Sequence, residues 1–428
     1  MRIAAFVIVF VFVVASRVPA AGQTSVQTTS SAPPVTLAEL ESLALDNNPA
    51  MSAARADIEA ARGRTTQAAK WPNPIAGYSG DELWAAGPPE RGKQGFFVEQ
   101  TIPLGGRRSR GRQVFERSAD RAEALLDLQV QRVLGSVRIL FYEALVAERR
   151  VEVQQRLAAL ARETVDVTAQ LFNVGVADRS DYIASQIEAR RAELALESAK
   201  NDVTATRHQL AAAVGRDDVA GRPFAGSIDE AIPVLERDAA RRDILERSPE
   251  LRAARAEVAR SQAVTALARR QTAPDLFVRA GGVYDRERNE ITGQSIGWEG
   301  KLETGVSVPL FDRNQGEITA SRAEETRAQA EVRRLELALE SEAAGEFATY
   351  LTSVRAADAY RREILPQAEE AHRLYLARYK EMAAAYPQVI AAQRTLFELS
   401  RDYLESVSRA WRSALLLQGY LAGDALRP

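Results

Sequence analysis

The chain contains no cysteine, two histidines and three methionines among its 428 residues. The absence of cysteine excludes disulfide bonds, cysteine-ligated zinc, a thiol nucleophile and a lipid on an N-terminal cysteine. The scarcity of His and Met argues against a dedicated site for a soft metal. The chain also has no large excess of one charge sign, with 56 Lys and Arg against 58 Asp and Glu. This balance argues against nucleic-acid binding held by bulk charge.

Long apolar runs are absent after residue 21, whereas residues 1–21 have the parts of a secretory signal peptide. Arg2 precedes the apolar stretch 3–15, and small residues follow at Ala20 and Ala21. A membrane anchor is the alternative, but a spanning helix needs ~20 apolar residues and this run has about 13. We therefore predict a cleaved signal peptide, followed by a flexible mature N-terminus over 22–36. A mature chain that crosses a membrane would then have to do so as a β-barrel.

The sequence repeats itself at a large period. The matching segments are Asn48–Ile58 with Ser248–Val258, Ile102–Leu104 with Val308–Leu310, and Ala184–Gln186 with Ala391–Gln393. The offset drifts only from 200 to 207 residues, which indicates duplication of one large unit rather than a solenoid of small repeats. We place the two repeats at 37–235 and 236–428.

Two pairs of strands are predicted, at about 74–84 with 94–103 and at about 275–285 with 298–309. In the last strand Leu302, Thr304, Val306, Val308 and Leu310 alternate with Glu303, Gly305 and Ser307. In the second strand Phe96, Val98 and Ile102 alternate with Phe97, Glu99 and Thr101. One apolar and one polar face suits a bilayer-spanning barrel, although an ordinary soluble hairpin fits each pair alone. Four aromatic residues lie near the strand ends, Tyr78, Trp84, Tyr284 and Trp298. In a membrane barrel they would form the aromatic girdles at the two interfaces.

Long helices are predicted after each pair of strands. Apolar residues at alternating spacings of four and three predict a helix over 106–172 and another over 316–380. Returning helices are predicted at 179–214 and 387–422, and a shorter helix at 38–70 precedes the first strands. A helix of some 65 residues is roughly 100 Å long. Such lengths describe a rod or a tube rather than a compact core.

Four spanning strands are too few for one chain to close a barrel. The smallest membrane barrels use about eight strands, and open edges in lipid would leave backbone groups without partners. The chain must therefore stay out of the membrane or close a barrel with copies of itself. Three copies would supply twelve strands, and two or four copies remain open on this argument.

The order of these features resembles the TolC family of outer-membrane efflux proteins. One segment that carries the resemblance is the turn Phe172–Asp181. The CzcC-like, heavy-metal-efflux branch of the family is resembled by three further segments, Asn48-Pro49, Pro72–Pro74 and Pro103–Arg110. The resemblance covers about 36–423. It implies a mainly α fold with a small membrane β portion, in which a homotrimer forms a long α-helical barrel and a 12-stranded β-barrel in outer-membrane lipid. The segment 215–249 would form the collar around the middle of the tube.

The function implied by the resemblance is a passive exit duct for metal cations or other substrates, located in the outer membrane of a Gram-negative bacterium and extending into the periplasm. Its partners would be a periplasmic adaptor (membrane fusion protein) and an inner-membrane pump of the RND type. No nucleophile–base pair and no cofactor motif stands out, so we expect neither catalysis nor a cofactor. A periplasmic coiled-coil scaffold or adaptor, and a duct for protein secretion, are the alternatives.

The resemblance also implies roles for particular residues. Val174, Gly175, Ser180 and Asp181 match the family's periplasmic turn, which docks the adaptor, and Met382 stands where the second half should have a glycine. The acids that narrow the pore in some relatives would fall at Gln388 and Ala391, so any charged ring would come from Asp178, Asp181 or Glu381 instead.

Two groups of basic or titratable residues have open interpretations. Arg107, Arg108, Arg110 and Arg112 form the densest basic run. They are either a solvated helix start or a cluster at the membrane interface, where anionic headgroups would attract them. The histidines, His208 and His372, have no neighbouring His or Cys, and we expect both at the surface rather than on a metal.

Overall fold

The computed structural model describes residues 33–81, 92–228, 230–288, 291 and 293–421. The predicted signal peptide and most of the predicted flexible N-terminus lie outside these residues. The helices are α1 (Leu37–Asn47), α2 (Pro49–Ala68), α3 (Arg107–Asn173), α4 (Arg179–Val214), α5 (Arg237–Arg247), α6 (Pro249–Arg270), α7 (Gln315–Ala359), α8 (Leu365–Lys380) and α9 (Tyr386–Gln418). Short helical turns lie at η1 (Asp217–Gly221) and η2 (Tyr360–Ile364). The strands are β1 (Val35–Thr36), β2 (Ile75–Asp81), β3 (Lys93–Pro103), β4 (Phe224–Ala225), β5 (Asp275–Arg288) and β6 (Ser295–Val306).

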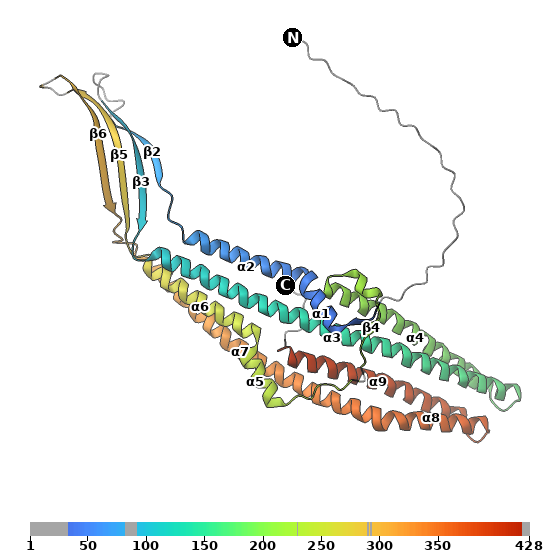
Figure 1. Ribbon diagram of the computed structural model, residues 1–428. Helices are drawn as coiled ribbons and strands as arrows, with labels where there is room; N and C mark the ends of the chain where they lie inside the picture. The colour runs from blue at the N-terminus through green and yellow to red at the C-terminus, as the bar shows by residue number, and fades with distance from the viewer. Residues whose placement is uncertain (1–32, 82–91, 229, 289–290, 292, 422–428) are drawn as a thin grey trace, which may run out of the picture.

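The molecule is elongated, with a sheet at one end and helices over the rest of its length (Figure 1). α3 has 67 residues, which corresponds to about 100 Å at 1.5 Å per residue. It packs against α2 and α6 toward the sheet, and against α4 and α9 toward the other end. The predicted rod and the predicted bounds of α3 and α4 are therefore confirmed.

The sheet has four antiparallel strands in the order β2-β3-β5-β6. β3 and β5 join the two hairpins, with Phe96 opposite Gly282 and Val98 opposite Ala280. Within the described residues, β2 and β6 each have one edge that pairs with no other strand. Among these residues, too, no helix is long and apolar enough to cross a membrane.

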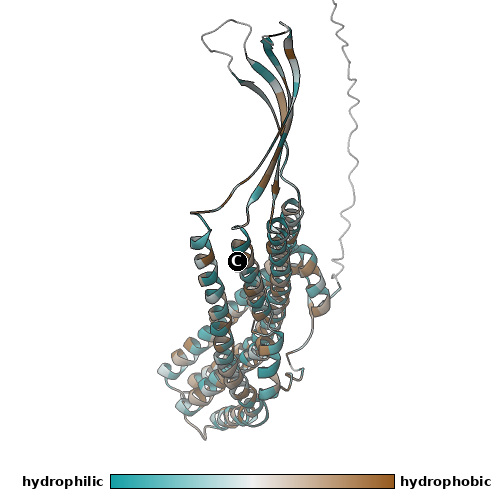
Figure 2. Ribbon diagram, turned by 90° about the vertical axis from the view of Figure 1, so that its left-hand side faces the viewer, coloured by the Kyte–Doolittle hydropathy of each residue, from teal (hydrophilic) through white to brown (hydrophobic). Residues whose placement is uncertain are grey.

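The two faces of the sheet differ in polarity, as the alternation predicts. The register puts several exposed apolar side chains on one face, and they are Tyr78, Phe96, Val98, Trp298, Leu302 and Val306. The opposite face carries charged side chains, and these are Lys93, Glu99, Arg279, Asp285, Glu299, Lys301 and Glu303. The mixed colouring of the strands in Figure 2 reflects this alternation.

Several predicted boundaries were wrong. β6 begins at Ser295 and ends at Val306 rather than running over 298–309, because the chain after Ser307 enters Pro309, which has no N–H for a strand ladder. Val308 and Leu310 therefore do not belong to the strand. β5 extends three residues beyond the predicted end, to Arg288, and Trp84 with the predicted end of β2 lies outside the described residues.

The helices of each half are interrupted more often than the sequence indicated. Instead of one helix over 38–70, α1 and α2 meet at an extended Asn48, because Pro49 disfavours a helical conformation at the preceding residue. Asn48 then caps α2, since its Oδ1 accepts a hydrogen bond from the Ala50 N–H at 2.9 Å. The helix predicted over 316–380 is broken by the π-helical turn η2 just before Pro366, whose ring cannot fit a regular helix.

A packed region surrounds the middle of α3. β1 pairs with β4 in parallel, so Val35 and Thr36, at the end of the segment predicted to be flexible, instead form a strand. The buried core here includes Val35, Val137, Phe141, Leu210 and Trp411. It fixes both helical hairpins at mid-length. The α9 helix ends at Gln418, short of the predicted 422.

Candidate functional site

Two helical turns lie together at the end of the molecule opposite the sheet (Figure 1). One joins α3 to α4 and contains Gly175, and the other joins α8 to α9 and contains Met382. A buried cluster packs the two hairpins against each other just behind the turns, and its members are Val167, Leu171, Ala177, Leu376, Tyr379, Tyr386 and Val389. We refer to the two turns, residues 172–181 and 379–386, as the tip.

Gly175 ends α3 in the left-handed conformation, with φ of 79°. The Val176 N–H donates to the Leu171 carbonyl and the Gly175 N–H donates to the Phe172 carbonyl, each at 2.9 Å. This pair of bonds defines a Schellman motif, in which glycine is the preferred residue. The glycine is therefore explained by the left-handed conformation that this turn requires.

Met382 takes the corresponding place in the second turn. Its φ is 60°, the Ala383 N–H donates to the Arg378 carbonyl, and the Met382 N–H donates to the Tyr379 carbonyl at 3.0 Å. The same motif thus forms without glycine, and the methionine side chain is 62% exposed. The position predicted for a glycine does have the geometry that favours one.

Exposed apolar side chains cover the tip. Val174 is 67% exposed and Val176 is 50% exposed, and the Phe172 ring stacks on Tyr182 with centroids 5.7 Å apart. The sequence analysis placed all three residues in this turn but gave a docking role to Val174 alone. The available signal was an apolar turn between two helices rich in Ala, Arg and Glu. Ser180, also selected, is exposed at the start of α4.

The acidic residues selected at the tip fall on both turns. Asp178 precedes α4 and Asp181 lies in its first turn, whereas Glu381 follows α8. Partial burial and the neighbouring Asp178 raise the pKa of Asp181 above its usual value. Gln388 and Ala391 are exposed on α9, so the second hairpin presents no acid at those two positions.

Ion pairs connect the two hairpins behind the tip. Lys380 of α8 contacts Glu163 of α3 at 2.8 Å. Glu188 of α4 is buried and accepts from Arg394 of α9, with a closest separation of 2.5 Å. Sequence reasoning missed these residues, because their partners are more than 200 positions away in the chain.

The basic run lies at the junction between the sheet and the helices. Arg107 contacts Asp275 at the start of β5 at 2.7 Å, and the Arg108 guanidinium lies 3.9 Å from the centroid of the Trp71 ring. Arg110 donates to Gln113 and Arg112 pairs with Glu116, both at 2.7 Å. Arg107 thus fastens β5 to α3, and Arg108 holds the segment that leads into β2, roles that the sequence did not reveal.

The polar face of the sheet contains two networks of ion pairs. Lys93 contacts Asp285 at 2.8 Å and Glu299 at 3.3 Å. Farther along the same face, Arg279 lies between Glu99 and Glu303. These networks join three strands, so the face opposite the apolar one is charged across its width.

The prediction that both histidines are at the surface was wrong for His372. His208 is exposed, but the side chain of His372 is buried between α8 and α3, with only 3% of the residue exposed. Burial lowers the pKa of His372, and the charge of Glu163 partly opposes this effect. No group of three or more His, Cys, Asp or Glu that could hold a metal ion occurs in the described part of the chain.

Long paired helices joined to a sheet with one exposed apolar and one charged face define a channel-forming subunit. The chain belongs to the family described as Outer membrane efflux protein, whose model matches residues 40–216 and 240–416. Proteins of this family work in tripartite systems with an adaptor and an inner-membrane pump.

Named relatives agree with this assignment. The chain is 26% identical over 393 residues to the cobalt-zinc-cadmium resistance protein CzcC of Cupriavidus metallidurans, with 91% of each chain covered. It is 26% identical over 294 residues to the nickel-cobalt-cadmium resistance protein NccC of Alcaligenes xylosoxydans xylosoxydans, covering 68% of this chain and 64% of the relative. The fold is similar to that of the outer-membrane channel OprN, with a TM-score of 0.76 at 19% identity and coverage of 91% and 90%.

The function predicted from the sequence, an outer-membrane efflux channel that extends into the periplasm, is confirmed by this family membership. The alternatives of a periplasmic scaffold and of a secretion duct are not favoured. The relatives are efflux proteins rather than enzymes.

Proposed function

We propose that three copies of the chain assemble into a passive exit duct. The observation that carries this proposal is the four-stranded sheet, which has one apolar face, one charged face and two edges without partners in the described chain. Twelve strands from three copies close a barrel with no free edge. The apolar faces contact outer-membrane lipid, and the charged faces line water.

The helices of the three copies continue this conduit through the periplasm as an α-helical barrel. Each chain contributes two repeats, 37–235 and 236–428, each with a pair of strands between shorter and longer helices. The duct supplies no energy of its own, and an inner-membrane pump of the RND type drives export through the adaptor. The basic cluster of Arg107, Arg108, Arg110 and Arg112 lies at the periplasmic surface of the membrane.

The tip docks the adaptor. Its exposed valines and Met382 offer apolar contacts, and Gly175 sets the shape of the first turn. Ser180 and Asp181 lie beside it in the first turn of α4 and offer polar contacts. Asp178, Asp181 and Glu381 line the narrow end of the pore as acidic groups. Within one chain, partial burial and then the charge of Asp178 raise the pKa of Asp181.

Metal cations are the cargo that we propose. The support is the resemblance to relatives named for cobalt, zinc, cadmium and nickel resistance. A wide aqueous duct need not bind its cargo, so a resident metal site is not required.

A deletion strain tests the cargo. We expect it to become sensitive to zinc, cobalt, cadmium or nickel, and to regain resistance when the gene is supplied in trans. Unchanged metal tolerance together with increased sensitivity to organic drugs would reassign the cargo. Loss of a secreted protein without any change in tolerance would reassign the duct to secretion.

Val174→Asp tests docking at the tip. Val174 is 67% exposed, so the substitution should leave folding intact while placing a charge in the docking surface. We expect site-specific crosslinking to the adaptor and metal export to fall together. Val234→Asp is the matched control, since this valine is 96% exposed and distant from the tip. Equal crosslinking in both variants would argue against a docking role.

A further inference from the structure

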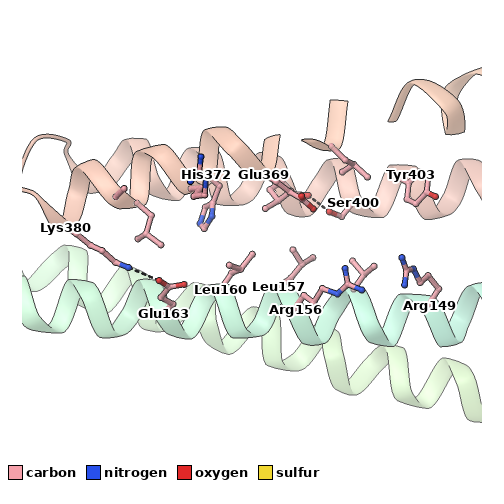
Figure 3. Close-up of a pocket in the computed structure, with 16 residues that line it drawn as sticks. Arg149, Arg156, Leu157, Leu160, Glu163, Glu369, His372, Lys380, Ser400 and Tyr403 are labelled. Carbon is pink, nitrogen blue, oxygen red and sulfur yellow. Dashed lines mark hydrogen bonds and ion pairs between the residues drawn. The ribbon is translucent and has the colours of Figure 1, made fainter. Parts of the chain in front are cut away.

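A groove runs between the two helical hairpins, on the sheet side of the tip. It encloses about 490 Å³ between α3, α8 and α9, a size typical of sites for small organic molecules. Aliphatic side chains line it from all three helices, with Leu157 and Leu160 on α3, Leu376 on α8 and Leu396 on α9. Figure 3 shows the α3 leucines facing α8 across the groove.

The charged groups around the groove balance one another. Three ion pairs occupy its rim, Glu163–Lys380, Arg149–Glu152 and Arg373–Glu370, with separations of 2.6–2.8 Å. The two further charged residues that line it, Arg156 and Glu369, are of opposite sign. The rim therefore demands no net charge from an occupant, because an added ion would have to compete with existing pairs.

His372 is a buried polar residue in the wall of the groove. Its residue is 3% exposed, and its Nε2 has no hydrogen-bond partner among the described residues. The ring points from α8 toward α3 and lines the groove (Figure 3). A buried polar atom without a partner is costly, so a ligand that hydrogen-bonds it gains affinity.

We propose that this groove binds an uncharged, largely apolar organic molecule that carries one hydrogen-bonding group, such as an alkylphenol. The apolar body lies on the leucines. The hydroxyl group bonds Nε2 of His372, which is shielded from solvent and becomes reachable when the ring turns about its Cβ–Cγ bond. Because the ligand contacts α3, α8 and α9 at once, its binding holds the two hairpins together. The site adjoins the tip, because Lys380 lines the groove, but it does not include the exposed valines of the first turn.

The two histidines of the chain make a direct test simple. The assembled channel, labelled with ¹⁵N-histidine and reconstituted in lipid nanodiscs, is titrated with 4-propylphenol and with propylbenzene at known free concentrations. We expect 4-propylphenol to shift the His372 imidazole resonances saturably and to leave those of His208 unmoved. Propylbenzene, which lacks the hydroxyl group, should bind about fivefold more weakly.

Ala377→Phe tests the location. Ala377 lines the groove from an exposed position on α8, so the larger side chain should block the ligand without disturbing the core. Ala159→Phe, at an exposed position on α3 outside the groove, is the control and should bind as the wild type does. The unchanged spectrum of His208 reports correct folding in both variants.

Three results would overturn the proposal. They are His372 resonances that do not move, equal affinities for the two probes, and unchanged binding in Ala377→Phe. None of these results bears on metal export, so the ligand site and the proposed duct fail or succeed independently.

Discussion

Met382 occupies a backbone conformation that glycine occupies in the other half of the chain. Both residues close the same Schellman motif, with φ of 60° at Met382 and 79° at Gly175. The left-handed conformation costs a side-chain-bearing residue about 1 kcal/mol. The second turn therefore retains a strain that the first turn avoids.

Met382→Gly should stabilise the second turn. Relief of the left-handed conformation contributes about 1 kcal/mol, and the greater freedom of glycine in the unfolded chain cancels roughly half of it. Hydrogen exchange of the amides around residue 382 should slow by about twofold. Gly175→Ala is the mirror experiment, because an added Cβ there meets no atom within 4 Å and only the backbone cost remains. Faster exchange in Met382→Gly would contradict this account.

His372 should make the packing of α8 on α3 sensitive to acid. Burial lowers its pKa in the folded protein below the ordinary value of 6.5, so the unfolded segment takes up a proton first as pH falls. Stability is therefore full above about pH 6.5 and decreases as pH falls from there toward the lowered pKa. Glu163, which faces the ring from α3, limits the effect by favouring the charged imidazole.

The measurement is hydrogen exchange in α8 at pH 7.5 and 5.5, corrected for intrinsic exchange rates. We expect local stability to be lower at pH 5.5 in the wild type and in His208→Gln, whose histidine is exposed. His372→Gln should remove most of the pH dependence. Should that variant retain the full dependence, a carboxylate such as Glu163 would be its source instead.

At the scale of elements, glycine allows β3 to approach β5. A Cβ at Gly95 would lie 2.1 Å from the Gly282 carbonyl oxygen and 2.7 Å from the Val283 Cα. Both are backbone atoms of the neighbouring strand, so no side chain can move aside. The pairing of β3 with β5 is what unites the two hairpins in one sheet.

Gly95→Ala should therefore weaken the sheet by about 1–3 kcal/mol, the usual cost of overpacking. We expect less folded oligomer in the outer membrane, measured as the fraction that resists unfolding in unheated gel electrophoresis. Gly300→Ala is the matched control on β6, because a Cβ there meets nothing within 4 Å. Equal losses in the two variants would show that glycine flexibility rather than close packing matters.

Helices with a long local pattern were predictable from the sequence, and strand ends were not. The bounds of α3 and α4 follow from an uninterrupted heptad and a glycine turn, both of which are local signals. The end of β6 depends on where β5 begins, because β6 has no backbone partner beyond that point, and on Pro309, which has no N–H to donate. The alternation of apolar and polar residues predicted that β6 would continue beyond Val306, but the residues there do not pair with β5.

The tip was predictable in part, for a similar reason. A glycine in a tight turn indicates a left-handed conformation, as found at Gly175, and the family resemblance pointed to Met382. The burial of His372 and the pairs Glu163–Lys380 and Glu188–Arg394 depend on contacts between hairpins far apart in the chain. The sequence of one helix shows which charged residues share a face, but it does not show which residues of another hairpin they pair with.

At the scale of the whole molecule, the free edges of β2 and β6 determine the assembly. If the sheet closes into a barrel, β2 of one protomer must lie beside β6 of the next. The native chain has no cysteine, so introduced cysteines report this contact without background. Disulfide formation requires Cβ atoms about 4 Å apart on the same face.

We expect Ser79→Cys in β2, combined in turn with Glu299→Cys, Lys301→Cys or Glu303→Cys in β6, to crosslink in one of the three registers. The register puts Ser79 and all three partners on the charged face, whereas Leu302→Cys lies on the apolar face and should not react. Oxidation of the reactive pair in membranes should give covalent dimers and trimers but nothing larger, because a closed ring of three has no free edge to extend. A fourth band would indicate a larger ring, and an open ladder would mean that the sheets pair without closing. If every cysteine pair gives only monomer, β2 of one protomer does not lie beside β6 of the next, and the proposal of a shared barrel fails.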